Sequence, residues 1–576
     1  MVWKITIPDL KINLIGLEKI KSFILKLFVL LFTFSFYSCK TKSEKSLSDL
    51  LNAFYDWHQI EYPEYSKDMS PYNFYLKSDK MNPNYENNYL SDLKKFNLEL
   101  FQIQKNKLND KNNFIHNTID RKINNLINRY GVSNNHLNDP SLHYIKIKKH
   151  LLVLIFSNSI DKNQKVNKLL STLDILPDYL SLISKSILKS NNFFIRKSLS
   201  EIDKIIELLD EIPLHFDFND DLLRSIEIKT LKVNKYLVSS KKWLTNDIST
   251  NYNLDLEKYS KYFNNNIKFI ERIYSYPDLT SSLDIYIKTI QNQIFDLSLP
   301  IYLEDNDEPI WSDRDDTLNV IKNVQQNIFQ TKQIEIDNPS KIISFNNLYN
   351  DILLYLMEEK LILDKEVFEI NFPDYGMYFK DDQPISIILG NYEKEKNDII
   401  FNNSTEYMSK SEILYFITNE LLPRNVFKIY NKQKLINYDF VNHYSWGILL
   451  SQVMIDLNPK IFNKKFQIYY KTKKLQDLTL LMSKIRYISK EFSFNESIDY
   501  LQGESFFIED NNLEYYFRKK LFDIEFNLEL FAASTYISTL YEKICIIDKD
   551  VSKKTFLKKI FKNGFITPSN YKSILN

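Results

Sequence analysis

Residues 409–426 read SKSEILYFITNELLPRNV, and residues 439–452 read DFVNHYSWGILLSQ. These two stretches combine clear helical patterns with side chains that could carry chemistry. In the first stretch, Ser409 and Glu412 have the spacing of a capping box, in which two side chains bond the free N–H groups at a helix start. Pro423 removes a helical hydrogen bond and is typical of a helix end. We therefore predict packed helices over 409–422 and 439–457.

Apolar residues of the first stretch fall on one helical face. Glu420 lies seven residues after Ile413, so a regular helix directs its carboxylate along this face. Burying an unpaired carboxylate is costly in free energy. We expect Glu420 either to pair with a Lys or Arg at the edge of the apolar stripe, or to be protonated, or to lie in a cleft. The residues that define the stripe are Ile413, Phe416, Ile417 and Leu421.

Several segments resemble one family when their order and spacing are considered together. Residues 419–426 resemble the His-Glu-x-x-Pro-Gly-His-His motif of the "domain of unknown function 885" family, which comprises bacterial zinc-peptidase-like proteins, often lipoproteins. Residues 444–447, YSWG, resemble its Glu-Gly-Trp-Ala segment. Residues 493–500 are similar to its Trp-Ser-Arg-Glu-Gln-Ala-Ile-Asp-Tyr region, and residues 561–568 to its closing Gly-and-Pro segment. Residues 51–65 resemble its opening helix and turn.

The resemblance implies a mostly α-helical, metallopeptidase-like domain with a central cleft and a minor β hairpin or short strands. The chain departs from the family at the implied metal ligands, because Asn419 and Asn425 stand where the family has histidines. Tyr444 stands where it has a glutamate. Zinc needs three or four N, S or O ligands, so we expect zinc to be lost and no cofactor to be bound. The motif positions compared are Asn419, Glu420, Pro423, Arg424, Asn425, Tyr444 and Trp446.

His443 leaves one catalytic alternative open. It adjoins the position of the lost glutamate, so Glu420 and His443 could form a general acid–base pair. The other interpretation is a helical histidine packed in the core or at the edge of a cleft. The sequence contains no Gly-x-Ser-x-Gly nucleophile elbow and no Cys-x-x-Cys pair. No catalytic residue is therefore assigned beyond the retained Glu420 and the possible His443.

Residues 1–39 have the order of a lipoprotein signal peptide. A basic region precedes an eleven-residue, mostly apolar run at 27–37, and Ser38 and Cys39 follow. Cys39 is the expected lipidation site. The alternative is an uncleaved signal anchor, although the apolar run is short for a membrane span of about 20 residues. We predict that residues 40–48 form a polar tether.

The remaining chain is predicted to form one continuous domain from about 49 to 576. Its N-terminal helical region covers 49–336, and its C-terminal helical region, 337–576, carries the degenerate motifs. We predict a short strand or hairpin around 385–389. Helical patterns at 169–183 and 202–209 are expected to be interrupted or ended by prolines. The expected breaks are at Pro140, Pro177, Pro213, Pro277 and Pro300.

Composition excludes several functional classes. The net charge of +1 gives no electrostatic case for nucleic acid. Seven glycines in 576 residues do not supply a phosphate-binding glycine loop. Cys545 is the one cysteine besides Cys39, so no intramolecular disulfide is expected.

Three functions remain from the sequence. The first is a lipid-anchored protein of the cell envelope, periplasmic or at the outer membrane, that binds or scaffolds an unknown peptide or envelope protein without catalysis. The second is an active hydrolase with rearranged ligands around Glu420 and His443. The third is a structural envelope protein whose cleft has no role.

Overall fold

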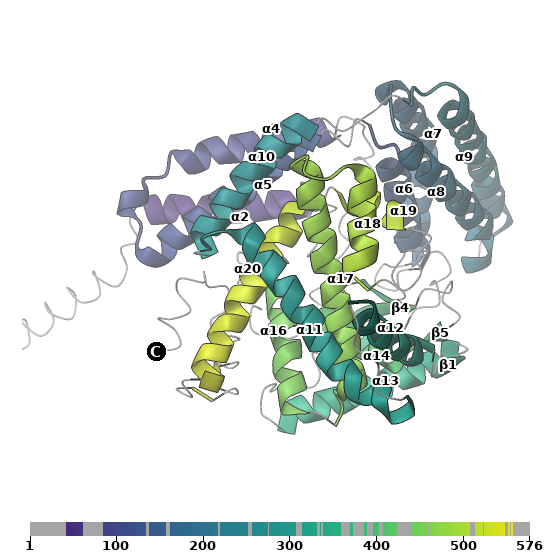
Figure 1. Ribbon diagram of the computed structural model, residues 1–576. Coiled ribbons are helices and arrows are strands. Elements are labelled where there is room, and N and C mark those ends of the chain that lie inside the picture. The colour runs from purple at the N-terminus through teal and green to yellow at the C-terminus, as the bar shows by residue number, and fades with distance from the viewer. Residues whose placement is uncertain are drawn as a thin grey trace, which may run out of the picture.

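The fold is mostly α-helical, as the sequence predicts (Figure 1). Among the described helices, none combines the length and the apolar character needed to cross a bilayer. The computed structural model describes residues 42–61, 85–133, 138–156, 162–216, 219–250, 256–274, 276–306, 314–330, 334–335, 338–358, 369–372, 385–388, 396–401, 407–422, 440–458, 460–506, 513–521, 524–547, 551–552 and 555–556.

The N-terminal helices form a small core of their own. Trp57 stacks on Tyr89, with ring centroids 5.5 Å apart and planes 6° from parallel. The indole Nε1 of Trp57 donates to Asp92 Oδ2 at 3.3 Å. This pairing of an apolar ring body with a satisfied N–H is the usual environment of a partly buried tryptophan. The elements are α2 (Lys42–Glu61), α4 (Tyr85–Phe101), η2 (Lys105–Lys107) and α5 (Asp110–Ser133).

The prediction that residues 40–48 form a polar tether is wrong from Lys42 onward, because helix α2 begins at that residue. Leu47 is only 1% exposed and packs in the same core as Leu50, Leu51 and Phe54. The apolar stripe of α2 therefore starts a turn earlier than the polar composition of residues 40–48 indicates. Burial of this leucine favours helix over an extended linker.

A four-helix group lies at the opposite side of the view in Figure 1, where α6 packs on α8 and α7 packs on α9. Two buried histidines of α6 join it to α7. His143 Nδ1 lies 2.9 Å from the Tyr179 hydroxyl, and His150 Nε2 lies 2.8 Å from Thr172 Oγ1. The elements are α6 (Ser141–Phe156), α7 (Lys162–Ser186), α8 (Asn192–Glu211), η4 (Ile212–His215) and α9 (Asp220–Asn246).

Two of the five prolines predicted to interrupt helices lie inside continuous helices. Pro177 lies inside α7, and Pro300 lies inside α11 (Leu279–Asp305). An interior proline costs about 3 kcal/mol or more. In α7 that cost is offset because Leu176 and Tyr179 beside the proline are fully buried. The breaks predicted at the other three prolines are confirmed, since Pro213 follows α8 in η4 and Pro140 and Pro277 precede helices.

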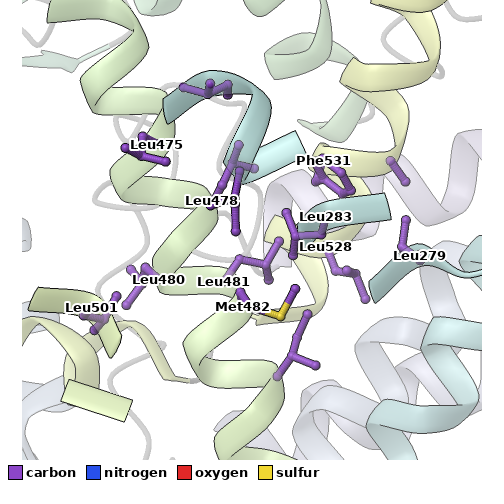
Figure 2. Packing of buried hydrophobic residues seen from close by; sticks show 14 of the residues in the cluster. Leu279, Leu283, Leu475, Leu478, Leu480, Leu481, Met482, Leu501, Leu528 and Phe531 are labelled. Carbon is purple, nitrogen blue, oxygen red and sulfur yellow. The ribbon is translucent and has the colours of Figure 1, made fainter. Parts of the chain in front are cut away.

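A central core joins residues from both sides of the 336/337 boundary. Leu279 and Leu283 of α11 pack with Leu478 and Met482 of α17 and with Phe531 of α20 (Figure 2). The two predicted regions therefore share one hydrophobic cluster. Its helices are α10 (Leu256–Tyr274), α11, α12 (Arg314–Gln330), α17 (Lys464–Ile488), α18 (Phe494–Glu504), α19 (Leu513–Lys520) and α20 (Ile524–Tyr541).

Short strands and further helices complete the described chain. The hairpin predicted around 385–389 is confirmed, since β3 pairs antiparallel with β4. Strand β2 extends this small sheet parallel to β4, and β1 pairs antiparallel with β5. The elements are β1 (Ile334–Glu335), α13 (Asn338–Glu358), β2 (Glu369–Asn371), β3 (Ile385–Ile388), β4 (Lys396–Phe401), β5 (Tyr407–Met408), α14 (Lys410–Phe416), η7 (Ile417–Leu421), α16 (Phe440–Leu457) and η10 (Glu542–Ile547).

Candidate functional site

The first motif helix starts as its sequence predicts. The Ser409 hydroxyl accepts from the Glu412 backbone N–H at 3.1 Å. Glu412 Oε2 accepts from the Ser409 N–H at 2.7 Å. The capping box is therefore confirmed, and α14 begins at Lys410. The next residues of the chain carry the motif itself.

The helix then changes type at the motif. Residues 417–421 form η7, a π-helix, instead of continuing the α-helix. π-helical turns are rare and occur often at functional sites. The turn coincides with the segment that resembles the zinc-binding motif. It also changes the register of every side chain that follows Phe416.

Asn419 occupies a closed position between two helices. It is 7% exposed. Its Nδ2 donates to the Tyr415 carbonyl at 3.1 Å and lies 3.3 Å from the Thr418 hydroxyl. Its Oδ1 accepts from Ser451 Oγ of α16 at 3.0 Å. The amide therefore has partners on both sides, and it joins η7 to α16.

Glu420 lies at the edge of the apolar stripe, which is one of the placements that the sequence predicts. A regular helical period would direct its carboxylate along the apolar face, and the side chain is instead partly exposed. The π-helical turn alters the spacing after Phe416, so Ile417, Leu421 and Leu422 fill the core while Glu420 reaches its edge. The remaining stripe residues, Ile413 and Phe416, are buried as predicted.

Tyrosines of α14 and α17 pack together next to the junction between η7 and α16. The Tyr415 ring of α14 lies 5.9 Å from Tyr469 and 6.0 Å from Tyr470 of α17. Burial raises the pKa of Tyr415 well above its usual value, and the nearby Asp477 carboxylate adds to the effect. Tyr415 is therefore a neutral phenol at physiological pH. Its ring provides packing surface, and the phenol cannot act as a phenolate nucleophile.

A partly buried lysine extends the tyrosine cluster toward α11. Lys474 Nζ donates to the Tyr286 hydroxyl at 2.6 Å. Burial opposes the charge on Lys474, but the oxygens of Tyr286 and Tyr470 favour it, so the pKa of Lys474 lies above its usual value. A lysine that stays protonated cannot serve as a nucleophile or general base.

The second motif helix is confirmed as α16, which spans Phe440 to Leu457. His443, Tyr444 and Trp446 lie on this helix, but their side chains lie outside the described residues, as do Pro423, Arg424 and Asn425 in full. The proposed pairing of Glu420 with His443 is therefore untested. Position 444 precedes Ser451 by seven residues, about two helical turns, and so shares its face of α16.

The described residues contain no group of three or more His, Cys, Asp or Glu side chains that could hold a metal ion. Residues 423–439 and the side chain of His443 are outside that statement. The expected loss of zinc therefore stays a prediction. Cys39 and its expected lipid also lie outside the described residues.

Sequence reasoning missed two polar residues of the junction. Ser451 was part of an apolar helix with no assigned role, yet it is the partner of Asn419. Thr418 is fully buried, and its hydroxyl donates a hydrogen bond to the Leu414 carbonyl at 2.8 Å. The seven-residue spacing places Ser451 on the same face of α16 as Tyr444, but nothing in the sequence pairs the serine with Asn419.

No family model matches the chain, and no curated protein matches it. Solved structures do match its large α-helical fold. One is described as "a putative lipoprotein of unknown function" from Shewanella oneidensis, with a TM-score of 0.58 and 12% identity over 92% of this chain and 98% of that chain. Another, a "putative lipoprotein" from Colwellia psychrerythraea, has a TM-score of 0.66 and 10% identity over 93% and 98%. At these identities, the similarity establishes a shared fold.

Proposed function

We propose that this chain is a lipid-anchored protein of the bacterial cell envelope that binds or scaffolds, without cleaving, a peptide or another envelope protein. In this proposal the fold descends from the zinc-peptidase-like family of domain of unknown function 885. The observation that carries the proposal is the hydrogen-bonded closure of Asn419 by Ser451 at the motif. Two independent features support it, one for location and one for chemistry.

The location rests on the first 39 residues. Their basic, apolar and Ser-Cys order is typical of a lipoprotein signal. Both solved structures with this fold are described as lipoproteins. Cys39 is accordingly proposed as the acylated residue, which places the domain in the periplasm or at the outer membrane.

The absence of catalysis rests on what occupies the motif positions. A catalytic zinc ion needs ligands that are free to coordinate it and an open position for the water that it activates. The Asn419 amide instead bonds to Tyr415, Thr418 and Ser451. Glu420 is retained, but a general base without a metal has only ordinary water to activate.

Binding is the role that the remaining features favour. Glu420 is partly exposed at the end of a capped helix, and its charge contributes to the raised pKa of nearby Tyr415. A carboxylate near aromatic side chains can receive a peptide through one charge-assisted hydrogen bond and apolar contact. The proposed partner is a peptide segment or an envelope protein. The net charge of +1 gives no reason to add nucleic acid.

The test is site-specific photo-crosslinking in cells. A photoreactive amino acid at position 420 should crosslink to a discrete envelope component. The same group at Leu231, an exposed residue of α9, is the matched control and should not. The Glu420→Arg variant should fail to rescue a deletion strain if the site is used for binding. Equal rescue by Glu420→Arg and wild type would favour the structural-protein alternative.

A further inference from the structure

The end of α4 exposes two large apolar side chains. Leu98 is 66% exposed and Phe101 is 88% exposed. They are three residues apart, so they share one face of the helix. Leu93 and Leu100 of the same helix are buried in the N-terminal core. The exposed pair is therefore separate from the packing of α4 and has no apolar neighbour to cover it among the described residues.

Lysines flank this pair in the sequence. Lys105 and Lys107 follow in η2 and are exposed, and Lys94 lies one helical turn before Leu98. Among the side chains described on these elements, the exposed acids are fewer, namely Asp49 on α2 and Glu99 on α4. Apolar side chains flanked by lysines are typical of protein surfaces that bind at the membrane–water interface. The apolar groups enter the headgroup boundary while the lysine stems reach anionic headgroups.

The same corner lies beside the start of the folded chain. Asn109, just after η2, donates from Nδ2 to Glu44 Oε1 in the first turn of α2 at 2.6 Å. Helix α2 packs against η2 and α4, and Figure 1 shows α2 beside α4. Lys42 and Lys45 are exposed on that first turn. The start of α2 and the exposed end of α4 therefore form one continuous surface.

The short distance in sequence between Cys39 and the start of α2 limits how far a lipid on Cys39 can lie from this corner. Cys39 precedes Lys42 by three residues, which span at most about 11 Å when fully extended. Because α2 begins at Lys42, no long tether separates the anchor from the domain. A lipid on Cys39 would hold this corner of the protein at the bilayer surface.

We propose that the corner formed by Leu98, Phe101, Lys105 and Lys107, together with Lys42 and Lys45, is a membrane-docking surface for an anionic bilayer. This inference rests on the lipid anchor proposed above. Phe101 and Leu98 enter the interface, and the lysines meet lipid phosphates. The anchor alone fixes one point, whereas this second contact fixes the orientation. The four-helix group α6–α9 then faces away from the membrane (Figure 1).

The test places a fluorophore at position 101 of the full lipidated protein. In Phe101→Cys the introduced thiol is the accessible one, because Cys39 carries the lipid and Cys545 is only 9% exposed. The labelled protein is reconstituted into phosphatidylethanolamine and phosphatidylglycerol vesicles that contain a quencher on the acyl chain. Leu231→Cys on α9 is the matched control. We expect quenching at 101 severalfold stronger than at 231, and weaker quenching when Lys105 and Lys107 are replaced by glutamate.

Mass spectrometry of the same sample separates the two proposals. Acylated Cys39 with equal quenching at 101 and 231 would overturn the docking surface and leave the anchor intact. Unmodified Cys39 would overturn the anchor and, with it, this orientation. A blue shift at 101 that appears with excess unlabelled protein and without lipid quenching would assign the surface to a second copy of the chain, which also overturns membrane docking.

Discussion

Ser451 of α16 donates a hydrogen bond of 3.0 Å to Asn419 of η7, a residue 32 positions earlier in the chain. The Ser451 hydroxyl also lies 2.9 Å from the Gly447 carbonyl, so its single proton is shared between two acceptors. This contact joins the two motif segments at the position where the family that the motif resembles has a metal ligand. Asn419 is therefore a structural residue in this chain.

The first prediction concerns that contact. Asn419→Ala removes buried hydrogen bonds and should lower the free energy of unfolding by about 1–3 kcal/mol. Ser451→Ala should cost less, because the serine also uses its own helix carbonyl. Combined in a double-mutant cycle, the two changes should show a coupling of about 0.5–1.5 kcal/mol in chemical denaturation. Strictly additive effects would mean that the two side chains do not interact.

The second prediction concerns location. Cys39→Ala removes the thiol that accepts the lipid, so the protein should leave the membrane fraction or accumulate as an unprocessed precursor. Cell fractionation with N-terminal analysis measures both results. The conservative control is Cys545→Ala, which should fractionate like wild type. An uncleaved N-terminus and unchanged membrane association in Cys39→Ala would support the signal anchor instead.

The sequence was sufficient where local chemistry decides the structure. The capping box at Ser409 and Glu412, the stripe at Ile413, Phe416, Ile417 and Leu421, and the short hairpin all follow from spacing alone. These features depend on residues close in the chain, so periodicity and capping rules reach them.

Prediction from the sequence failed where packing between residues distant in the chain determines the local structure. Pro177 remains helical because its neighbours are buried by helices far away in sequence. The early start of α2 depends on a core that Leu47 shares with α4 and α5. The π-helical turn at 417–421, which packs against α16, has no signal in the local sequence. The partnership of Asn419 with Ser451 crosses two helices and has no local signal.

The third prediction concerns acid sensitivity of the α6–α7 contact. Burial lowers the pKa of His150 to about 3, and Lys146 and Lys168 add to this. The unfolded chain takes up this proton below about pH 6.5, whereas the folded chain resists it until about pH 3. The stabilisation is therefore present above about pH 6.5 and is lost as pH falls, by about 1.4 kcal/mol per pH unit.

The matched variant for this effect is His150→Gln, which can still bond Thr172 but does not titrate. Between pH 7 and pH 5, wild type should lose about 2 kcal/mol more stability than the variant. Denaturation curves at the two pH values measure the difference. The account of His150 fails if both proteins lose the same amount.

The fourth prediction has the opposite sign and concerns Asp139, at the start of α6. Burial raises its pKa from 3.8 to about 6, although hydrogen bonds from Ser141 oppose the shift. The folded state therefore holds this proton more tightly, and its stabilisation declines as pH rises from about 4 to about 6. At pH 7 the ionised carboxylate lowers the free energy of unfolding by up to about 3 kcal/mol relative to the protonated form.

Asp139→Asn should accordingly stabilise the protein at pH 7 and change it little at pH 4. Asparagine can still accept from the Ser141 N–H and hydroxyl, which lie on Oδ1 at 2.9 and 2.5 Å. Thermal melts at the two pH values measure this gain. A variant that is less stable than wild type at pH 7 would show that the charge on Asp139 is favourable.

The central claim, that the motif binds no catalytic zinc, is tested most directly by elemental analysis of full-length protein purified without chelator, combined with a broad peptide-library assay of the same preparation. The account predicts far less than one zinc per chain and no metal-dependent cleavage. It also predicts no rescue by Asn419→His, because ligands that act as a unit are not restored one at a time. Stoichiometric zinc together with peptide cleavage that Glu420→Gln abolishes would contradict it, and would identify the chain as an active hydrolase with rearranged ligands.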